Sequence, residues 1–187
     1  MRTQRLALRP PRADDAQAIF TGFAADEAVT RYVAWPRHTS LEDTRAFLRF
    51  AQEQWRLWPA GPLVIESVQS GELIGATGLA FEAPCIASTG YVLGRRFWGQ
   101  GYASEALAAV LSLAQTLGVQ RLYALCHADH RASLGVLERG NFRFEALLPR
   151  HAIFPNLGVA EAQDVRCFVA VDVGQGTPYR QRPPQPG

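Results

Sequence analysis

Apolar and polar residues alternate along several short stretches of the chain, as they do in β-strands that have one buried face. Residues 5–9 show this alternation, and the pair Pro10-Pro11 ends it. Stretches rich in β-branched or aromatic residues follow, separated by turn residues such as Gln69-Ser70-Gly71, and they indicate an antiparallel meander and later strands. The further strands predicted in this way are 63–68, 72–81, 86–93, 121–127, 141–148 and 164–173.

Helical spacing of apolar residues marks the remaining elements. Asp14 is expected to cap a first helix, and Ser40 with Asp43 forms a capping box for a second. A third helix starts at Tyr102 and ends before Gly118, which has the place of a helix-terminating glycine. A short fourth helix is predicted for residues 131–139.

The order of these elements predicts the fold class. The third helix connects two strands that lie in one sheet, and such a crossover requires a parallel, right-handed connection. We therefore predict an α+β fold with a mixed, mostly antiparallel central sheet of about seven strands flanked by about four helices. Residues 1–173 form one domain, and residues 174–187, rich in Pro, Gly, Gln and Arg, are predicted to be a disordered tail.

Composition excludes several classes of function. The chain has 187 residues with a formal net charge of +2, too small and too dispersed for a nucleic-acid or membrane-surface stripe. The odd set Cys85, Cys126 and Cys167 stands in apolar surroundings without metal-site spacing, so these residues are interpreted as reduced core thiols. No signal peptide or spanning segment is recognisable, and we expect a cytoplasmic protein.

A glycine-rich turn between the strand 86–93 and the helix at Tyr102 is the strongest functional signal. A helix N-terminus offers free N–H groups and a positive dipole end, and the missing side chains of Gly99 and Gly101 let an anion approach closely. The turn lacks the third glycine of a dinucleotide fingerprint and the lysine of a nucleotide-triphosphate loop. A pyrophosphate site is favoured over a merely structural tight turn.

The residues around this turn resemble the GNAT acetyltransferase superfamily. Arg96, Gly99 and Gly101 fit its cofactor pattern Arg/Gln-x-x-Gly-x-Gly/Ala. The run from Gly90 to Ala106 is similar to the subfamily that includes the ribosomal-protein N-terminal acetyltransferases. The resemblance extends to Arg5-Leu6-x-Leu-Arg9, Trp35-Pro36-x-His38-Thr39-Ser40 and Val136-Leu137-Glu138-Arg139.

This resemblance implies a cofactor site and an acceptor site. The fourth and fifth strands should splay apart so that the pantetheine arm of acetyl-CoA lies between them, with a backbone N–H near Leu93 facing the thioester oxygen. Tyr32, Trp35 and His38 are expected near the acceptor amine. The residues expected to bind the cofactor are Tyr91, Val92, Leu93, Arg96, Phe97, Trp98, Gly99, Gln100, Gly101, Tyr102, Ala103, Ser104, His130 and Ser133.

The chain departs from the family pattern after the fifth strand. His130 replaces the usual asparagine that touches the cofactor arm, while Ser133 keeps the serine expected near the thioester sulfur. Leu137 stands where many members have the tyrosine that protonates the departing thiolate, so Ser133 is the candidate for that role. Gly140-Asn141 replaces Leu-Gly, which predicts a changed helix cap only.

The proton acceptor stays open at the level of sequence. His151 is one candidate catalytic residue, with a solvated loop histidine as the alternative, and Glu105 and Glu145 are weaker candidates. His127 and Asp129 with His130 superficially resemble metal ligands, but adjacent strand residues point to opposite faces, so no metal is expected.

The expected function is transfer of an acetyl group from acetyl-CoA to a primary amine, either a protein N-terminus or a small molecule, without a covalent enzyme intermediate. No nucleic-acid or membrane partner is expected, and a homodimer is an option because such assemblies are common. Two alternatives remain: a non-catalytic acyl-CoA-binding module and a nucleotide-binding site at the same turn.

Overall fold

The computed structural model describes residues 1–171 and 173, and the predicted tail 174–187 lies outside this part of the chain. The strands are β1 (Leu6–Arg9), β2 (Pro62–Ser67), β3 (Leu73–Ala83), β4 (Ile86–Leu93), β5 (Arg121–His127), β6 (Phe142–Ala152) and β7 (Gln163–Ala170). The helices are α1 (Ala16–Ile19), α2 (Glu27–Thr30), α3 (Leu41–Leu57), α4 (Tyr102–Thr116) and α5 (Arg131–Arg139). Short single helical turns also occur at Ala13–Asp15, Phe20–Ala24, Arg95–Phe97 and Pro155–Leu157. None of the helices within the described residues combines the length and the apolarity needed to cross a membrane.

One sheet in the order β1-β2-β3-β4-β5-β7-β6 forms the centre of the molecule. Every neighbouring pair is antiparallel except β4 and β5, which run parallel because α4 returns the chain across the sheet. The predicted mixed, mostly antiparallel sheet of seven strands is therefore confirmed.

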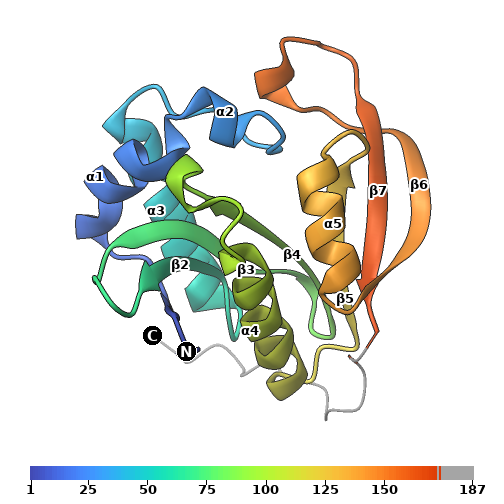
Figure 1. Ribbon diagram of the computed structural model, residues 1–187, viewed down its shortest axis with the longest axis horizontal. Coiled ribbons are helices and arrows are strands. Elements are labelled where there is room, and N and C mark those ends of the chain that lie inside the picture. The colour runs from blue at the N-terminus through green and yellow to red at the C-terminus, as the bar shows by residue number, and fades with distance from the viewer. Residues whose placement is uncertain (172, 174–187) are drawn as a thin grey trace.

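Helices cover both faces of this sheet. Along β2, Leu63 and Ile65 pack into the core with α4 and α5, whereas Val64 packs into a second core with Ile19 and Phe23. This alternation is the period-two pattern of a strand that is buried on both faces. Figure 1 shows α4 in front of the sheet and α3 behind it.

Helix ends follow local chemistry. The capping box at the start of α3 is confirmed, since Ser40 accepts the N–H of Asp43 while the Asp43 carboxylate accepts the N–H of Ser40. Gly118 ends α4 in the left-handed conformation (φ 72°), and its N–H and that of Val119 bond to carbonyls of the last turn. The changed cap after α5 is also confirmed, because Asn141 takes the left-handed conformation (φ 60°) there.

The predicted cap of the first helix is wrong. Asp14 lies in a single turn and makes no capping bond, and α1 begins only at Ala16. Asp15 takes the structural role instead, because its carboxylate accepts the N–H of Arg12 and pairs with the Arg9 guanidinium at 2.7 Å. Burial alone would raise the pKa of Asp15, but these hydrogen bonds hold it below its usual value.

Candidate functional site

The sheet opens between β4 and β5. Their parallel register consists of Ile86↔Arg121, Ala87↔Leu122 and Ser88↔Tyr123 and ends there, so the last part of β4 and the last part of β5 diverge. The predicted splay of the fourth and fifth strands is confirmed. A cavity of about 1400 Å³ extends from this opening, and residues of α1, α2 and α3 line it together with residues of α5.

The glycine-rich turn leads from β4 into α4 at one end of this cavity. Gly99 (φ 72°) and Gly101 (φ 82°) both have left-handed backbone conformations, which a glycine adopts without strain. A Cβ added at Gly99 would meet nothing within 4 Å, so the space beside this backbone is open. The turn thus presents bare backbone at the N-terminus of a fifteen-residue helix, where an anion is favoured.

Hydrogen bonds hold the turn in place. The Trp98 indole donates to the carbonyl of Leu93 at 2.8 Å, and the Gln100 amide donates to the carbonyl of Arg96 at 2.7 Å. Arg5 donates to the carbonyl of Gln100 at 2.9 Å and pairs with Glu105 at 2.7 Å. These contacts fix the turn without using the N–H groups of the first helical turn.

The structure gathers most of the residues expected at the cofactor site. Of that set, Arg96 and Gln100 do not line the cavity, and Arg96 forms an exposed ion pair with Glu72. The three residues expected near the acceptor also line it. The expected residues that line the cavity are Tyr91, Val92, Leu93, Phe97, Trp98, Gly99, Gly101, Tyr102, Ala103, Ser104, His130, Ser133, Tyr32, Trp35 and His38.

Ser133 belongs to a cluster of polar side chains contributed by three elements. The Tyr91 hydroxyl on β4 donates to Ser133 Oγ on α5 at 3.1 Å, and Cys126 on β5 lies against the same serine. Burial raises the pKa of Tyr91 to about 12 and also raises the pKa of the Cys126 thiol. Both groups are therefore protonated near neutral pH, and Ser133 has a proton donor behind it that local sequence did not reveal.

Aromatic and imidazole rings stack beside this cluster. The Tyr32 ring lies 4.6 Å from the His130 ring in a stacked arrangement and 4.9 Å from that of His127. The Phe154 ring meets His127 edge to face at 4.8 Å. Burial, and then the neighbouring His127, lowers the pKa of His130, so this ring is neutral near pH 7.

Asn156 fixes the segment that carries the expected acceptor residues. Its side-chain oxygen accepts the N–H of Arg37 at 2.8 Å, and its nitrogen donates to the carbonyls of Thr30 and Trp35 at 2.8 and 2.9 Å. More than a hundred residues separate Asn156 from these partners in the chain. This contact joins the turn after β6 to the segment after α2.

The three carboxyl or imidazole candidates for proton acceptor lie elsewhere. His151 is exposed on β6 and does not line the cavity. Glu105 bonds Thr3 and Arg5 on the side of β1, and Glu145 pairs with Arg121. No group of three or more His, Cys, Asp or Glu side chains within the described residues is arranged to hold a metal ion.

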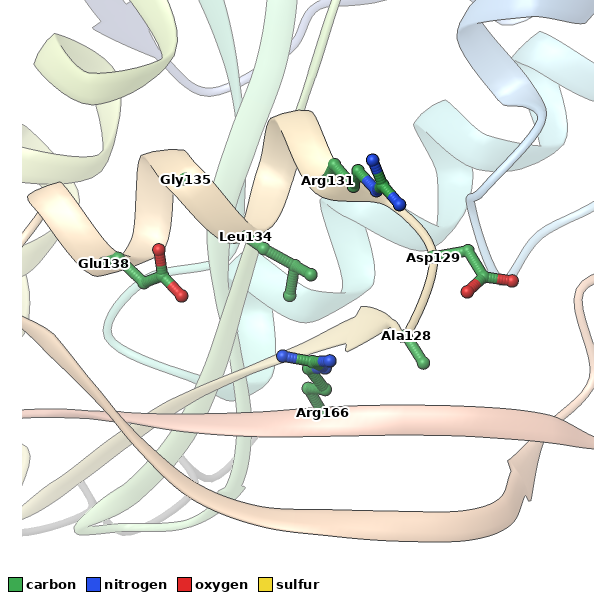
Figure 2. Close-up of a pocket in the computed structure, with 7 residues that line it drawn as sticks. All are labelled: Ala128, Asp129, Arg131, Leu134, Gly135, Glu138 and Arg166. Atoms are coloured by element: carbon green, nitrogen blue, oxygen red, sulfur yellow. The ribbon is translucent and has the colours of Figure 1, made fainter.

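A smaller hollow of about 380 Å³ lies between α5 and β7. Figure 2 shows Arg166 rising from β7 toward α5, with Arg131 and Asp129 at one end and Glu138 at the other. Both signs of charge line this hollow, so it does not select an anion as the glycine turn does.

Known proteins share this sequence and fold. The sequence model of a family described as "Acetyltransferase (GNAT) domain" matches residues 5–143. The uncharacterized N-acetyltransferase YoaA of Bacillus subtilis (strain 168) is 33% identical over 159 residues, which cover 81% of this chain and 86% of that protein.

Solved structures show the same architecture. RimL, a ribosomal L7/L12 alpha-N-protein acetyltransferase in complex with coenzyme A, superposes with a TM-score of 0.80 at 23% identity, covering 94% of this chain and 97% of that one. Spermidine N-acetyltransferase from Vibrio cholerae, in complex with CoA and spermine, superposes with a TM-score of 0.74 at 16% identity, covering 89% and 95%. At these identities the likeness establishes the fold.

Proposed function

The chain belongs to the GNAT acetyltransferase family, and on that premise we propose that it transfers an acetyl group from acetyl-CoA to a primary amine by direct attack in a ternary complex. The observation that carries this proposal is the bare glycine turn at the start of α4, which opens onto the gap between β4 and β5. An anion site and a slot for an extended arm meet there, as the pyrophosphate and the adjoining pantetheine arm of coenzyme A require.

The residues present fit acetyl-CoA. We assign the pyrophosphate to the N–H groups of the turn from Gly99 to Ser104, and the pantetheine arm to the edge of β4 from Tyr91 to Leu93. Arg96 stands at the outer edge of the turn, where it can exchange Glu72 for a phosphate. When bound, acetyl-CoA supplies the acetyl thioester and a thiol leaving group.

Three demands of the reaction fall on this chain's own residues. We assign stabilisation of the negative charge that develops on the thioester oxygen to the backbone N–H near Leu93. Ser133 donates a proton to the departing sulfur, and Tyr91 replenishes it through their hydrogen bond. In this arrangement Tyr91 supplies the phenol that position 137, a leucine, lacks.

The amine must lose a proton before or as it attacks. An α-amine with a pKa near 8 is neutral in roughly a quarter of molecules at pH 7.5, so it needs little assistance, whereas a lysine-like amine needs a base. His130 supports this role better than His151, because His130 lines the cavity and its lowered pKa keeps the ring neutral.

The test is release of free coenzyme A from acetyl-CoA in the presence of purified protein and a panel of primary amines. We expect amine-dependent release and an acetylated product of matching mass. Tight CoA binding without amine-dependent release across the panel would instead indicate the non-catalytic acyl-CoA-binding module. The homodimer and the cytoplasmic location expected from the sequence stay predictions.

A further inference from the structure

The wall of the cavity formed by α2, the segment after it and α3 is apolar and rich in aromatic rings. Its side chains include Tyr32, Val33, Trp35, Phe47 and Phe50, and Phe154 from the segment after β6 adds a further ring to the cavity. Phe50 is 54% exposed on α3, although it lines the cavity, so its ring is not needed to fill a core. Such a surface stabilises the apolar part of a bound molecule by excluding water from it.

This wall offers a single carboxylate within the described part of the chain. Asp43 is the one acidic residue among the described residues that line the cavity. Its carboxylate already accepts the N–H groups of Thr39 and Ser40 at 2.8 and 2.9 Å, at the start of α3. The charged groups that remain in the lining are Arg37 and Arg139, which repel a cation.

A second acid, Asp26 at the start of α2, is engaged as well. Asp26 caps α2 through the N–H of Ala28 and pairs with Arg95 at 2.7 Å, and it does not line the cavity. A second ammonium group on the acceptor would therefore lie against mostly apolar surface, in a cavity whose charged lining residues are one carboxylate, Asp43, and two guanidinium groups, Arg37 and Arg139. Burial of an unpaired charge is strongly unfavourable.

A further polar atom of this region belongs to the His127 ring. His127 Nδ1 accepts the N–H of Asp129 at 3.1 Å, so Nε2 is the ring nitrogen that carries a proton. The His127 side chain is 5% exposed, and Nε2 has no partner within the described residues. This donor can satisfy a carbonyl or hydroxyl oxygen, but it cannot hold a cation.

We infer that the acceptor is a primary amine carried on an apolar aliphatic or aromatic body that bears no second positive charge. This inference rests on the proposed acyl transfer and names the substrate class within it. Polyamines and aminoglycosides are thereby excluded as preferred acceptors. A primary amine on an apolar body is found both in free apolar amines and in peptides whose first residue is apolar.

A matched pair of acceptors tests the inference. Hexylamine and 1,6-diaminohexane have the same chain length and the same reacting group and differ in the second ammonium. We expect kcat/KM for hexylamine to exceed that for 1,6-diaminohexane by about tenfold or more. Equal values, or a preference for the diamine, overturn the inference and leave acyl transfer intact.

Two variants of α3, one a test and one its control, show whether the apolar wall causes this preference. Phe50→Glu places a carboxylate on the apolar wall, so the preference for hexylamine over the diamine should shrink by about tenfold. Leu57→Glu adds the same charge on the same helix at a residue that is 55% exposed and does not line the cavity, so the preference should stay unchanged. An unchanged preference in Phe50→Glu, or an equal change in both variants, contradicts the assignment of the wall.

A binding measurement separates failure of the proposed acyl transfer from failure of the inferred acceptor class. If no amine is acetylated, the proposed function fails, and thermal stabilisation of the CoA-loaded protein then tests the inference alone. Hexylamine should raise the melting temperature more than 1,6-diaminohexane, and the reverse order or no effect overturns the inference. Comparison of 2-phenylethylamine with tetrapeptides that begin with Phe or Lys shows whether the acceptor is a free amine or a peptide. Preference for the Lys peptide over the Phe peptide counts against the inference.

Discussion

At the scale of single residues, Asn156 shows how distant parts of the chain build the acceptor region. Its amide makes three hydrogen bonds to the backbone of the segment that carries Tyr32 and Trp35. All three partners are backbone groups, so Asn156 holds the backbone of that segment directly. Asn156 is in this sense a positioning residue for the acceptor.

Replacement of Asn156 by alanine should raise the KM for the acceptor amine about tenfold and leave the Kd for CoA within about twofold. The loss of three hydrogen bonds costs on the order of 1–3 kcal/mol and loosens the segment rather than the cofactor site. Steady-state kinetics with varied amine, together with calorimetry of CoA binding, measures the two effects. An equal loss in both constants would show that Asn156 acts only on overall stability.

Ser133 and Tyr91 form the second pair of residues whose roles can be separated. Ser133→Ala should lower kcat by about 10- to 100-fold, because the proton donor for the departing thiolate is lost. The Kd for CoA should change little, since the serine hydroxyl contributes no charge to binding. Tyr91→Phe should lower kcat less, because the serine hydroxyl remains.

Single-turnover acetylation with saturating acetyl-CoA measures this chemical step directly. Ser112→Ala is the matched control, since its hydroxyl bonds only the carbonyl of Ala108 on the exposed side of α4. A Ser133→Ala enzyme with an unchanged chemical rate would remove Ser133 from the mechanism.

At the scale of elements, the glycine turn before α4 can be tested with a control in the same backbone conformation. Gly99 (φ 72°) and Gly71 (φ 70°) both have open space where a Cβ would stand, but only Gly99 lines the cavity. Valine at either position causes the same left-handed strain. Gly99→Val should therefore raise the Kd for CoA by about tenfold or more, whereas Gly71→Val should lower stability alone.

Calorimetric titration with CoA and thermal melting of both variants give the two readings. A similar change in CoA affinity for both variants would mean that strain, and not the bare backbone of the turn, explains the effect.

The elements also show what a sequence can predict. The bounds of β4, β5 and α5 match the prediction because each has a clear period and a turn or cap at both ends. The strand predicted for 141–148 continues to Ala152, past Pro149 and a left-handed Arg150 (φ 48°), because pairing with β7 resumes after a bulge. Pairing with a distant strand leaves no local signal.

The candidate site likewise contains residues that local sequence predicts and residues that only the tertiary structure brings together. The cofactor turn is local, so its residues could be found from spacing and resemblance. The Tyr91–Ser133 hydrogen bond and the Asn156 contacts each join elements that are far apart in the chain, and burial by distant segments is what leaves His127 Nε2 without a partner among the described residues. Their roles depend on the tertiary arrangement, which the order of residues does not display.

At the scale of the whole molecule, the sheet consists of two parts with a weak seam. Strands β1 to β4 form one part, and β5, β7 and β6 form the other. Three register pairs join β4 to β5, and beyond them the parts are held by helices α4 and α5 and by Asn156. A ligand that lies along the opening contacts both parts and should stabilise the native state.

Coenzyme A is therefore expected to raise the melting temperature. At a free concentration a hundred times its Kd, a ligand that binds only the native state stabilises it by about 2.7 kcal/mol. For a chain of this size, that corresponds to a shift of about 5–10 °C. Pantetheine, which lacks the pyrophosphate and the adenosine, should give a smaller shift at the same concentration, because it leaves the glycine turn unused. Differential scanning fluorimetry with CoA, ATP and NAD side by side measures this, and an equal shift with ATP or NAD would assign the turn to nucleotides in general instead of to an acyl carrier.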